Sequence, residues 1–470
     1  MAYTPTIGLE IHAELATKTK LFCNSKNDPD ERRPNVNICP VCMGHPGTLP
    51  VLNKEAVRQV IRVGTAIGGT IADFTEFDRK NYFYPDIPKG YQITQYAYPL
   101  VVGGELQDVS ITRVHLEEDT ARSQHGERGE SLLDFNRAGV PLMELVTEPV
   151  IRSAEEASAF ARELQLLLRY LGASEANMDK GEMRVEANIS ISKDGARGTK
   201  VEIKNLNSFR AVERAIAYEM ERQERILESG EKVAQETRGW DEGKQKTFSQ
   251  RVKESSHDYR YFPDPDVPKL KISEVAEFQN IAATLPELPS DKRARLGEKF
   301  GLATKMAEYF VGDALACAFF EESIAPFEED AKKIMLAANY LVSDVAGLMQ
   351  KKGDGYSSLK FTPLDFASLV EMIHRREISS RGAKDILAAM YARGGKPESL
   401  ARELHLYQRS NRDELVELAK KLIAEDPKIA AEYRAGKTQA IQFFIGRGMK
   451  ETKGSANPQL LKEVFEEALQ

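Results

Sequence analysis

Four short segments of the chain alternate polar and apolar residues, so that acids, histidines and cations fall on one side of each. The segments are residues 8–14, 112–117, 183–191 and 200–205. This alternation is typical of half-buried β-strands, in which successive side chains point to opposite faces. The polar sets are Glu10, His12 and Glu14; Arg113, His115 and Glu117; Arg184, Glu186, Asn188 and Ser190; and Lys200, Glu202 and Lys204.

The solvated face of an antiparallel sheet gives the same alternation, and each segment taken alone fits that simpler interpretation. Together the four segments favour a functional face, because they use two of the chain's seven histidines and an asparagine. If the strands are neighbours, one sheet face gathers acids, histidines and cations. Such a face is what a site for a metal ion and a nucleotide requires.

Helices and short turns separate these strands. Residues 153–171 are predicted to form a helix, with Ser153 as its N-cap and apolar residues at helical spacing. A second helix is predicted over residues 207–229, ending before Gly230. Helices packed against a mixed or antiparallel sheet predict an α+β catalytic domain over residues 1–289.

Two proline-rich stretches, 263–268 and 285–289, mark the end of this domain, because proline fixes φ and removes a backbone donor. Residues 290–408 are predicted to be all helical. Residues 409–470 are predicted to form a separate small helical tail domain.

The composition is that of a globular protein with a net charge of −7 and 41% hydrophobic residues. No apolar run approaches the roughly 18 residues of a membrane span, and the first residues lack signal-peptide features. Four cysteines give no disulfide framework, so we expect a cytoplasmic protein. Basic residues gather near the C-terminus, where they could meet phosphate or form an ordinary solvated helix face. They are Arg434, Lys437, Arg447, Lys450 and Lys453, with Glu451 among them.

The familiar phosphate-binding loops are missing from the sequence. Gly436, Lys437 and Thr438 resemble the end of a P-loop, but Ala431 stands where its first glycine is required. Any ATP would therefore bind on a sheet surface.

Cys39 and Cys42 have the spacing of metal ligands, and Cys23 lies upstream. Tetrahedral zinc needs four ligands. Ser25 occupies a suitable fourth position but is a poor ligand, and His45 could substitute. A metal-free remnant of a zinc site is the favoured interpretation, with zinc as the alternative.

Several longer motifs, spread in order along essentially the whole chain, closely resemble GatB, the family of B subunits of tRNA-dependent amidotransferases. The motifs are Gly8-Leu-Glu-Ile-His12, Phe77-Asp-Arg-Lys-Asn-Tyr-Phe-Tyr-Pro-Asp86, Lys89-Gly-Tyr-Gln-Ile-Thr-Gln95, His115-Leu-Glu-Glu-Asp119, residues 198–209, residues 235–241, Asp258-Tyr-Arg-Tyr-Phe-Pro263, residues 433–437 and residues 449–458.

The resemblance implies a catalytic domain with a glutamine-synthetase-like fold, and a helical tail that binds tRNA. It also implies a heterotrimer, in which the partners are an amidase, the A subunit, together with a small C subunit. The B subunit uses ATP and Mg²⁺ to phosphorylate the side-chain carboxylate of Glu-tRNA(Gln) or Asp-tRNA(Asn). Ammonia, which the amidase releases from glutamine, then displaces the phosphate.

The resemblance also implies roles for individual residues. It assigns catalytic roles to Glu10, His12, Glu118 and Glu202. The same four residues would form the Mg²⁺ site, with Glu117 and Glu186 as further candidates. ATP or the substrate carboxylate would meet Lys80, Arg184, Lys200, Lys204 and Asn205, and tRNA would meet Arg434, Lys437, Lys450 and Lys453.

Two details of the sequence depart from what the resemblance implies. Many family members have Cys-Asp-Ala-Asn where this chain has Val185-Glu-Ala-Asn188, so Glu186 extends the charge by one methylene. Strict alternation places Glu117, and not Glu118, on the face that carries His115, unless a β-bulge intervenes.

Two other functions fit parts of the sequence. A free-standing carboxylate–amine ligase acting on a small amino acid would explain the acidic sheet but not the basic tail. A non-catalytic tRNA-binding scaffold would explain the tail but not the acids. The chain has no recognisable glutaminase nucleophile, so ammonia must come from a partner.

Overall fold

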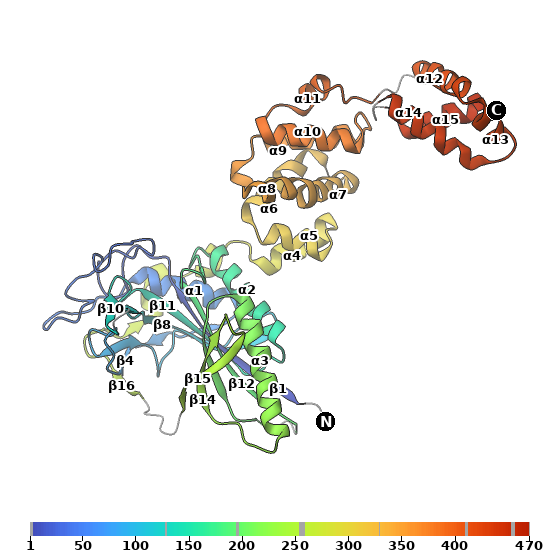
Figure 1. The fold of residues 1–470 in the computed structure, drawn as a ribbon. Coiled ribbons are helices and arrows are strands. Elements are labelled where there is room, and N and C mark those ends of the chain that lie inside the picture. The colour runs from blue at the N-terminus through green and yellow to red at the C-terminus, as the bar shows by residue number, and fades with distance from the viewer. Residues whose placement is uncertain are drawn as a thin grey trace. The chain divides into compact units, whose positions relative to one another are not determined.

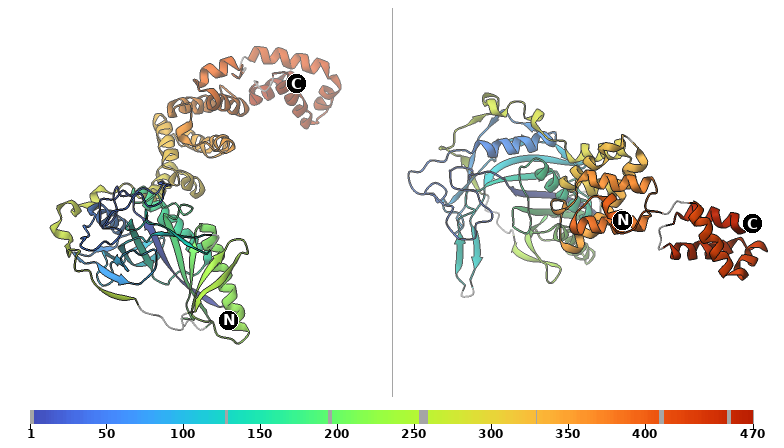
Figure 2. Two further views of the ribbon diagram at one scale, coloured as in Figure 1. Left: turned by 60° about the vertical axis from the view of Figure 1, so that its left-hand side comes forward. Right: turned by 90° about the horizontal axis from the view of Figure 1, so that it is seen from above.

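We analysed a computed structural model of the chain, which describes residues 3–126, 129–193, 197–252, 259–328, 330–408, 412–452 and 456–469. The chain divides into two compact units, Met1–Pro289 and Ser290–Gln470. The first combines strands and helices, and every named element that follows it is a helix (Figures 1 and 2). The predicted α+β class is therefore confirmed.

A ten-stranded sheet forms the centre of the first unit. It is mixed, because β13 and β14 run parallel while their neighbours pair antiparallel. In sheet order the strands are β15 (Lys246–Val252), β14 (Glu236–Asp241), β13 (Val201–Leu206), β12 (Met183–Ser192), β1 (Thr4–Glu14), β11 (Pro141–Thr147), β8 (Val109–Glu118), β6 (Val101–Val102) and β2 (Thr70–Ile71), and β7 (Glu105–Leu106) pairs with β8.

Three helices cover the apolar face of this sheet: α1 (Lys54–Ala66), α2 (Ala154–Tyr170) and α3 (Phe209–Glu228) (Figure 1). Their apolar sides share one buried cluster with the inward residues of the strands, such as Ile11 of β1 and Phe160 of α2. The helices predicted over 153–171 and 207–229 are α2 and α3. Ser153 caps α2 as predicted, accepting a hydrogen bond from Glu156 N, and Ser208 caps α3 in the same way.

Since the helices cover one face, the alternating polar residues lie on the other. A small three-stranded sheet adjoins that polar face through β5. Its strands are β16 (Arg260–Pro263), β4 (Asp78–Asn81) and β5 (Tyr91–Thr94), and two further pairs are β9 (Arg122–His125) with β10 (Ser131–Asp134) and β3 (Phe74–Thr75) with β17 (Leu270–Lys271).

The second unit is helical throughout its named elements, and α12 to α15 share a buried apolar cluster of their own. Among the described residues, no helix is long and apolar enough to cross a bilayer. The helices are α4 (Pro289–Phe300), α5 (Thr304–Val311), α6 (Ala314–Ile324), α7 (Ala331–Tyr340), α8 (Ala346–Lys352), α9 (Pro363–His374), α10 (Ser380–Arg393), α11 (Pro397–Glu403), α12 (Arg412–Glu425), α13 (Pro427–Arg434), α14 (Ile441–Glu451) and α15 (Pro458–Leu469).

Candidate active site

Strand pairing aligns four polar side chains across the sheet. His12 of β1 lies opposite Arg184 of β12 and Glu144 of β11, and Glu144 lies opposite His115 of β8. Directly opposed residues on a sheet face have Cβ atoms only about 5 Å apart. The row is therefore a consequence of register, and it joins strands that are far apart in the sequence.

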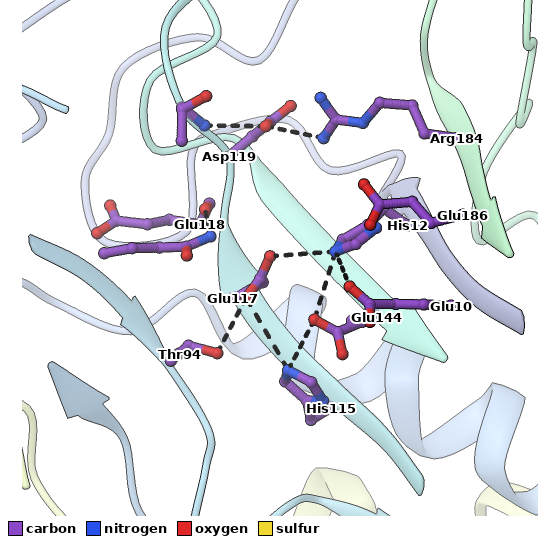
Figure 3. A network of polar contacts seen from close by, with 12 residues as sticks. Glu10, His12, Thr94, His115, Glu117, Glu118, Asp119, Glu144, Arg184 and Glu186 are labelled. Atoms are coloured by element: carbon purple, nitrogen blue, oxygen red, sulfur yellow. Dashed lines mark hydrogen bonds and ion pairs between the residues drawn. The ribbon is translucent and has the colours of Figure 1, made fainter. Parts of the chain in front are cut away.

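The His12 imidazole is the centre of the cluster (Figure 3). Its Nε2 lies 3.3 Å from Glu144 Oε2, 3.7 Å from Glu117 Oε1 and 3.8 Å from Glu10 Oε1. His115 Nε2 approaches the same acids, at 3.4 Å from Glu144 and 3.9 Å from Glu117. Three carboxylates and two imidazoles thus converge on one point of the sheet.

Burial sets the charges of this cluster. Burial disfavours the charged form of His12, but the hydrogen bond to Glu144 and the nearby carboxylates outweigh it and raise the pKa of His12 to about 9. Burial, together with the charge of Glu144, raises the pKa of Glu10 to about 7. Burial lowers the pKa of His115. At neutral pH the His12 imidazolium therefore faces the Glu144 carboxylate, whose pKa the histidines and Arg113 lower, and Glu10 is poised to titrate.

The cluster also offers the donors that a divalent cation needs. The ligand atoms of Glu10, His12 and Glu144 lie within 4.8 Å of one another, as do those of His115, Glu117 and Glu144. His115 Nδ1 is buried and has no hydrogen-bond partner among the described residues. Carboxylate oxygens are the ligands that Mg²⁺ prefers. The residues present fit such an ion, whose charge would replace that of the His12 proton.

A second acidic group lies on the next strands. Lys204 Nζ of β13 lies 2.7 Å from Glu186 and 3.4 Å from Glu202, and Thr237 Oγ1 donates to Glu202 at 2.7 Å. Burial disfavours the Lys204 ammonium, but Glu186 and Glu202 raise its pKa overall. The Oδ1 atom of Asn188 is buried without a partner among the described residues. These two strands therefore place acids, one cation and a free amide oxygen next to the His12 cluster.

Arg184 is held in place by a buried acid at the other end of the row. Asp119 accepts hydrogen bonds from Arg184 at 2.9 Å and from Arg137 at 2.8 Å. Arg137 also pairs with Glu14. Although burial disfavours the Asp119 carboxylate, the two guanidinium groups lower its pKa. The Arg184 side chain remains 36% exposed, so it can still meet a ligand.

The structure separates Glu117 from Glu118. Glu117 joins the His12 cluster and accepts a hydrogen bond from Thr94 at 3.0 Å. Glu118 points the other way, where it pairs with Lys89 and accepts a bond from Ile93 N at 2.9 Å. The alternation of β8 therefore continues to its end without a bulge there.

Two cavities lie on the Glu118 side of the site. One is lined by Glu118, Lys89 and Cys42. The other, an open hollow of about 610 Å³, is lined by Val41, residues 44–48 and Pro50 together with Lys89, Tyr91 and Ile93. The His12 cluster itself lies on the sheet face and lines neither of these two cavities.

The remaining predicted ligands of a nucleotide lie at different places. Lys80 of β4 lies against two tyrosine rings. Its Nζ is 4.8 Å from the centroid of the Tyr259 ring and 5.9 Å from the centroid of the Tyr82 ring. Lys200 is exposed just before β13. The side chain of Asn205 lies outside the part of the chain that the structure describes.

The three cysteines converge as their spacing predicts, but a lysine joins them. The sulfur atoms of Cys23, Cys39 and Cys42 lie within 4.8 Å of one another. Lys20 is completely buried, and its Nζ donates to Cys42 Sγ at 3.7 Å. Ser25 Oγ lies 3.9 Å from the same sulfur. The three thiols are grouped as ligands of a metal ion would be, but no fourth thiolate accompanies them, and the buried Lys20 ammonium already supplies positive charge beside Cys42.

Some basic residues of the tail already make contacts within the chain. Arg434 Nε donates to Leu469 O at 3.1 Å, and Lys437 lies 3.3 Å from Glu432. Lys450 is exposed on α14. Lys453 lies outside the described residues.

Sequence reasoning missed Glu144, Asp119 and Arg137 as site residues. Glu144 had a signal, since it is a single charge within the apolar run Val140-Pro-Leu-Met-Glu-Leu-Val146, which otherwise fits a fully buried strand. Asp119 is the last residue of the motif His115–Asp119, but nothing in the spacing of that motif indicated that two arginines from other segments would bind its carboxylate.

With this geometry in place, comparison with known proteins identifies the class. Residues 5–277 match the model of the GatB/GatE catalytic domain, and residues 318–469 match that of the GatB domain. The chain therefore belongs to the GatB family.

Full-length relatives agree with this assignment. The chain is 43% identical to the B subunit of the aspartyl/glutamyl-tRNA(Asn/Gln) amidotransferase of Synechocystis sp., over 98% of this chain and 97% of the relative. The protein of the same name from Thermomicrobium roseum is 44% identical, over 100% of this chain and 99% of the relative.

Proposed function

We propose that this chain is the amide-forming subunit of a tRNA-dependent amidotransferase, and that it activates the side-chain carboxylate of Glu-tRNA(Gln) or Asp-tRNA(Asn) with ATP. The observation that carries this proposal is the cluster of Glu10, His12, Glu117 and Glu144 on the sheet face opposite the helices, with cations around it. Membership of the GatB family supports the same conclusion, since the relatives are named as amidotransferases that act on these tRNAs.

The reaction needs two steps because a carboxylate is a poor electrophile towards ammonia. In the first, a carboxylate oxygen of the tRNA-bound residue attacks the γ-phosphorus of ATP, and the bond to the β-phosphate oxygen breaks to release ADP. In the second, ammonia attacks the acyl carbon, phosphate leaves with the former carboxylate oxygen, and the excess proton passes to solvent. The product is the side-chain amide.

The site residues divide the work by charge. Glu10, His12, Glu117 and Glu144 would hold a divalent cation, which offsets the repulsion between the polyphosphate and the carboxylate when bound. Lys80 and Lys204 would neutralise phosphate oxygens. Arg184 is held by Asp119 and offers exposed donors for the substrate carboxylate. Glu202 would support Lys204, which it approaches at 3.4 Å.

We further propose the partners and the division of the chain. The ammonia would come from an amidase, the A subunit, with a small C subunit completing a heterotrimer. Residues 1–289 would be the catalytic domain, residues 290–408 a connecting helical domain, and residues 409–470 the tRNA-binding tail.

The test is amide formation on misacylated tRNA in the reconstituted complex. We expect Glu10→Gln and Glu144→Gln to abolish amide formation nearly completely, while the partner's release of ammonia from glutamine continues. Exposed Glu224 of α3 provides a matched Glu→Gln control. Full activity in Glu10→Gln would favour a non-catalytic scaffold, and turnover with free glutamate would favour a free-standing ligase.

A further inference from the structure

Three cysteines of the first unit form a compact group for which the proposed chemistry has no use. The Sγ atoms of Cys23, Cys39 and Cys42 all lie within 4.8 Å of one another. Cys23 lies in a turn that the bridge between Thr19 and Lys26 closes, and Cys39 and Cys42 lie together in a second turn. Sulfur atoms this close are within reach of a disulfide bond, once side-chain rotation brings two of them to roughly 2 Å.

Cys42 is the cysteine whose sulfur is surrounded by donors. Lys20 Nζ donates to it at 3.7 Å, and the Cys39 backbone N–H donates to it at 3.1 Å. Lys20 is completely buried, and a buried ammonium needs a negative partner. The acidic side chains that act on Lys20 are the three thiols. This environment therefore favours the thiolate of Cys42, which is the nucleophilic form of a cysteine.

Cys23 is placed to react with Cys42 once that sulfur is oxidised. Its thiol hydrogen-bonds to the Cys42 sulfur. Cys23 and Cys39 are half-buried, and the more buried Cys42 lines a cavity, so a molecule as small as hydrogen peroxide can approach the group. A nucleophilic thiolate beside a second thiol is the arrangement of cysteines that respond to oxidants.

Ser25 favours this chemistry over binding of a metal ion. Its Oγ lies 3.9 Å from Cys42 Sγ, where a fourth thiolate would complete a tetrahedral zinc site. A hydroxyl there leaves the Cys42 sulfur with hydrogen-bond donors around it, and hydrogen bonds do not consume its nucleophilic electron pair as a bond to zinc would.

We propose that Cys23 and Cys42 form a reversible disulfide, with hydrogen peroxide as the oxidant and a small thiol as the reductant. The Cys42 thiolate attacks one peroxide oxygen, the O–O bond breaks, and the hydroxide that leaves takes a proton from solvent. The Cys23 sulfur then attacks the resulting sulfenic acid, the S–O bond breaks, and the oxygen leaves as water with the Cys23 proton. The two sulfurs lose two electrons in all, and the peroxide becomes two waters. This site is independent of the proposed function.

The test is a thiol count and a peptide map of the full chain. After reduction and removal of the reductant, the chain has four thiols. We expect a small excess of hydrogen peroxide to lower the count to two, and mass spectrometry without reduction to find Cys23 linked to Cys42. Dithiothreitol should restore all four thiols. Cys317 is the internal control, because it is buried in α6 and donates to the Glu321 carboxylate, which disfavours its thiolate.

Variants assign the roles of the individual residues. Cys39→Ser should still form the disulfide. Cys23→Ser should instead accumulate a sulfenic acid on Cys42, which the reagent dimedone traps for mass spectrometry. Lys20→Met removes the ammonium and should slow the oxidation of Cys42 by roughly tenfold. Its unfolding temperature shows whether it folds, and the two cysteine variants carry the test if it does not.

Other outcomes overturn the inference. Four thiols that survive the peroxide would show that the group is not reactive. A link from Cys39 to Cys42, or between two chains, would mean that Cys23 is not the partner. Oxidation of Cys317 at the same rate would mean that the group has no selectivity. Bound zinc that protects the three thiols from peroxide would show that they serve a metal instead.

Discussion

His12 shows how a single residue couples this site to pH. Its pKa rises from 6.5 to about 9 on folding, so protonation of His12 stabilises the fold. That contribution is complete below about pH 6.5 and is lost as the pH rises through 9. Glu10 acts in the same direction over a lower range, because its raised pKa of about 7 makes ionisation unfavourable in the folded chain.

We therefore expect the metal-free chain to lose thermal stability between about pH 6.5 and 9, and Mg²⁺ to restore it most strongly at the upper end. A bound cation replaces the proton, so metal affinity should rise with pH over the same range. Differential scanning calorimetry with and without Mg²⁺ measures both effects. In His12→Gln the pH dependence should be flatter over this range. An unfolding temperature that does not change with pH in the unmodified chain would contradict this account.

The three cysteines lead to a second prediction at the residue scale. Since Ser25 stands in the fourth position and Lys20 already donates to Cys42, we expect the purified chain to contain well under one equivalent of zinc. A strong chelator should leave its unfolding temperature unchanged.

The variant Ser25→Cys completes a set of four thiols and is expected to gain zinc, measured by elemental analysis. Cys317→Ser, which changes a cysteine in helix α6 away from the cluster, is the control. One equivalent of zinc in the unmodified chain, lost together with stability on chelation, would show that three thiols suffice here.

At the scale of elements, period-two alternation was enough to predict which strands carry the polar residues and which of their faces is polar. Alternation placed Glu117 with His115 while the resemblance put the catalytic role on Glu118, and the sequence did not decide between them; in the structure Glu117 lies with His115 and Glu118 pairs with Lys89. The order of the strands could not be predicted. Strand β11 lies between β1 and β8, and the residues of β1 that pair with it are more than 100 positions away in the sequence. Glu144 was missed for the same reason, as its neighbours are set by long-range register.

The small sheet was harder still to predict. Its strands β4 and β16 are separated by more than 170 residues in the sequence. The motifs that contain Lys80 and Tyr259 were visible, but their proximity was not. Chemistry that depends on one segment was therefore predictable from the sequence, while chemistry shared between distant segments needed the structure.

At the scale of the whole molecule, the chain joins an acidic catalytic unit to a helical unit with basic residues near its end. The net charge of −7 would repel tRNA, so binding depends on local cationic side chains. Lys450 is exposed on α14, and Lys437 is 70% exposed despite its pairing with Glu432. Each phosphate contact adds to both the affinity and its dependence on salt.

We expect the double variant Lys437→Glu and Lys450→Glu to weaken tRNA binding by at least tenfold at physiological salt, and to reduce the slope of log affinity against log salt by about one to two units. ATP binding should not change, because both lysines lie in the second compact unit. Filter binding over a series of salt concentrations gives both quantities.

The matched control is the double variant Lys420→Glu and Lys421→Glu, which changes two exposed lysines of α12 in the same tail. If the control weakens tRNA binding as much as the test variant does, then tRNA responds to the total charge of the tail. The assignment of binding to Lys437 and Lys450 would then be wrong.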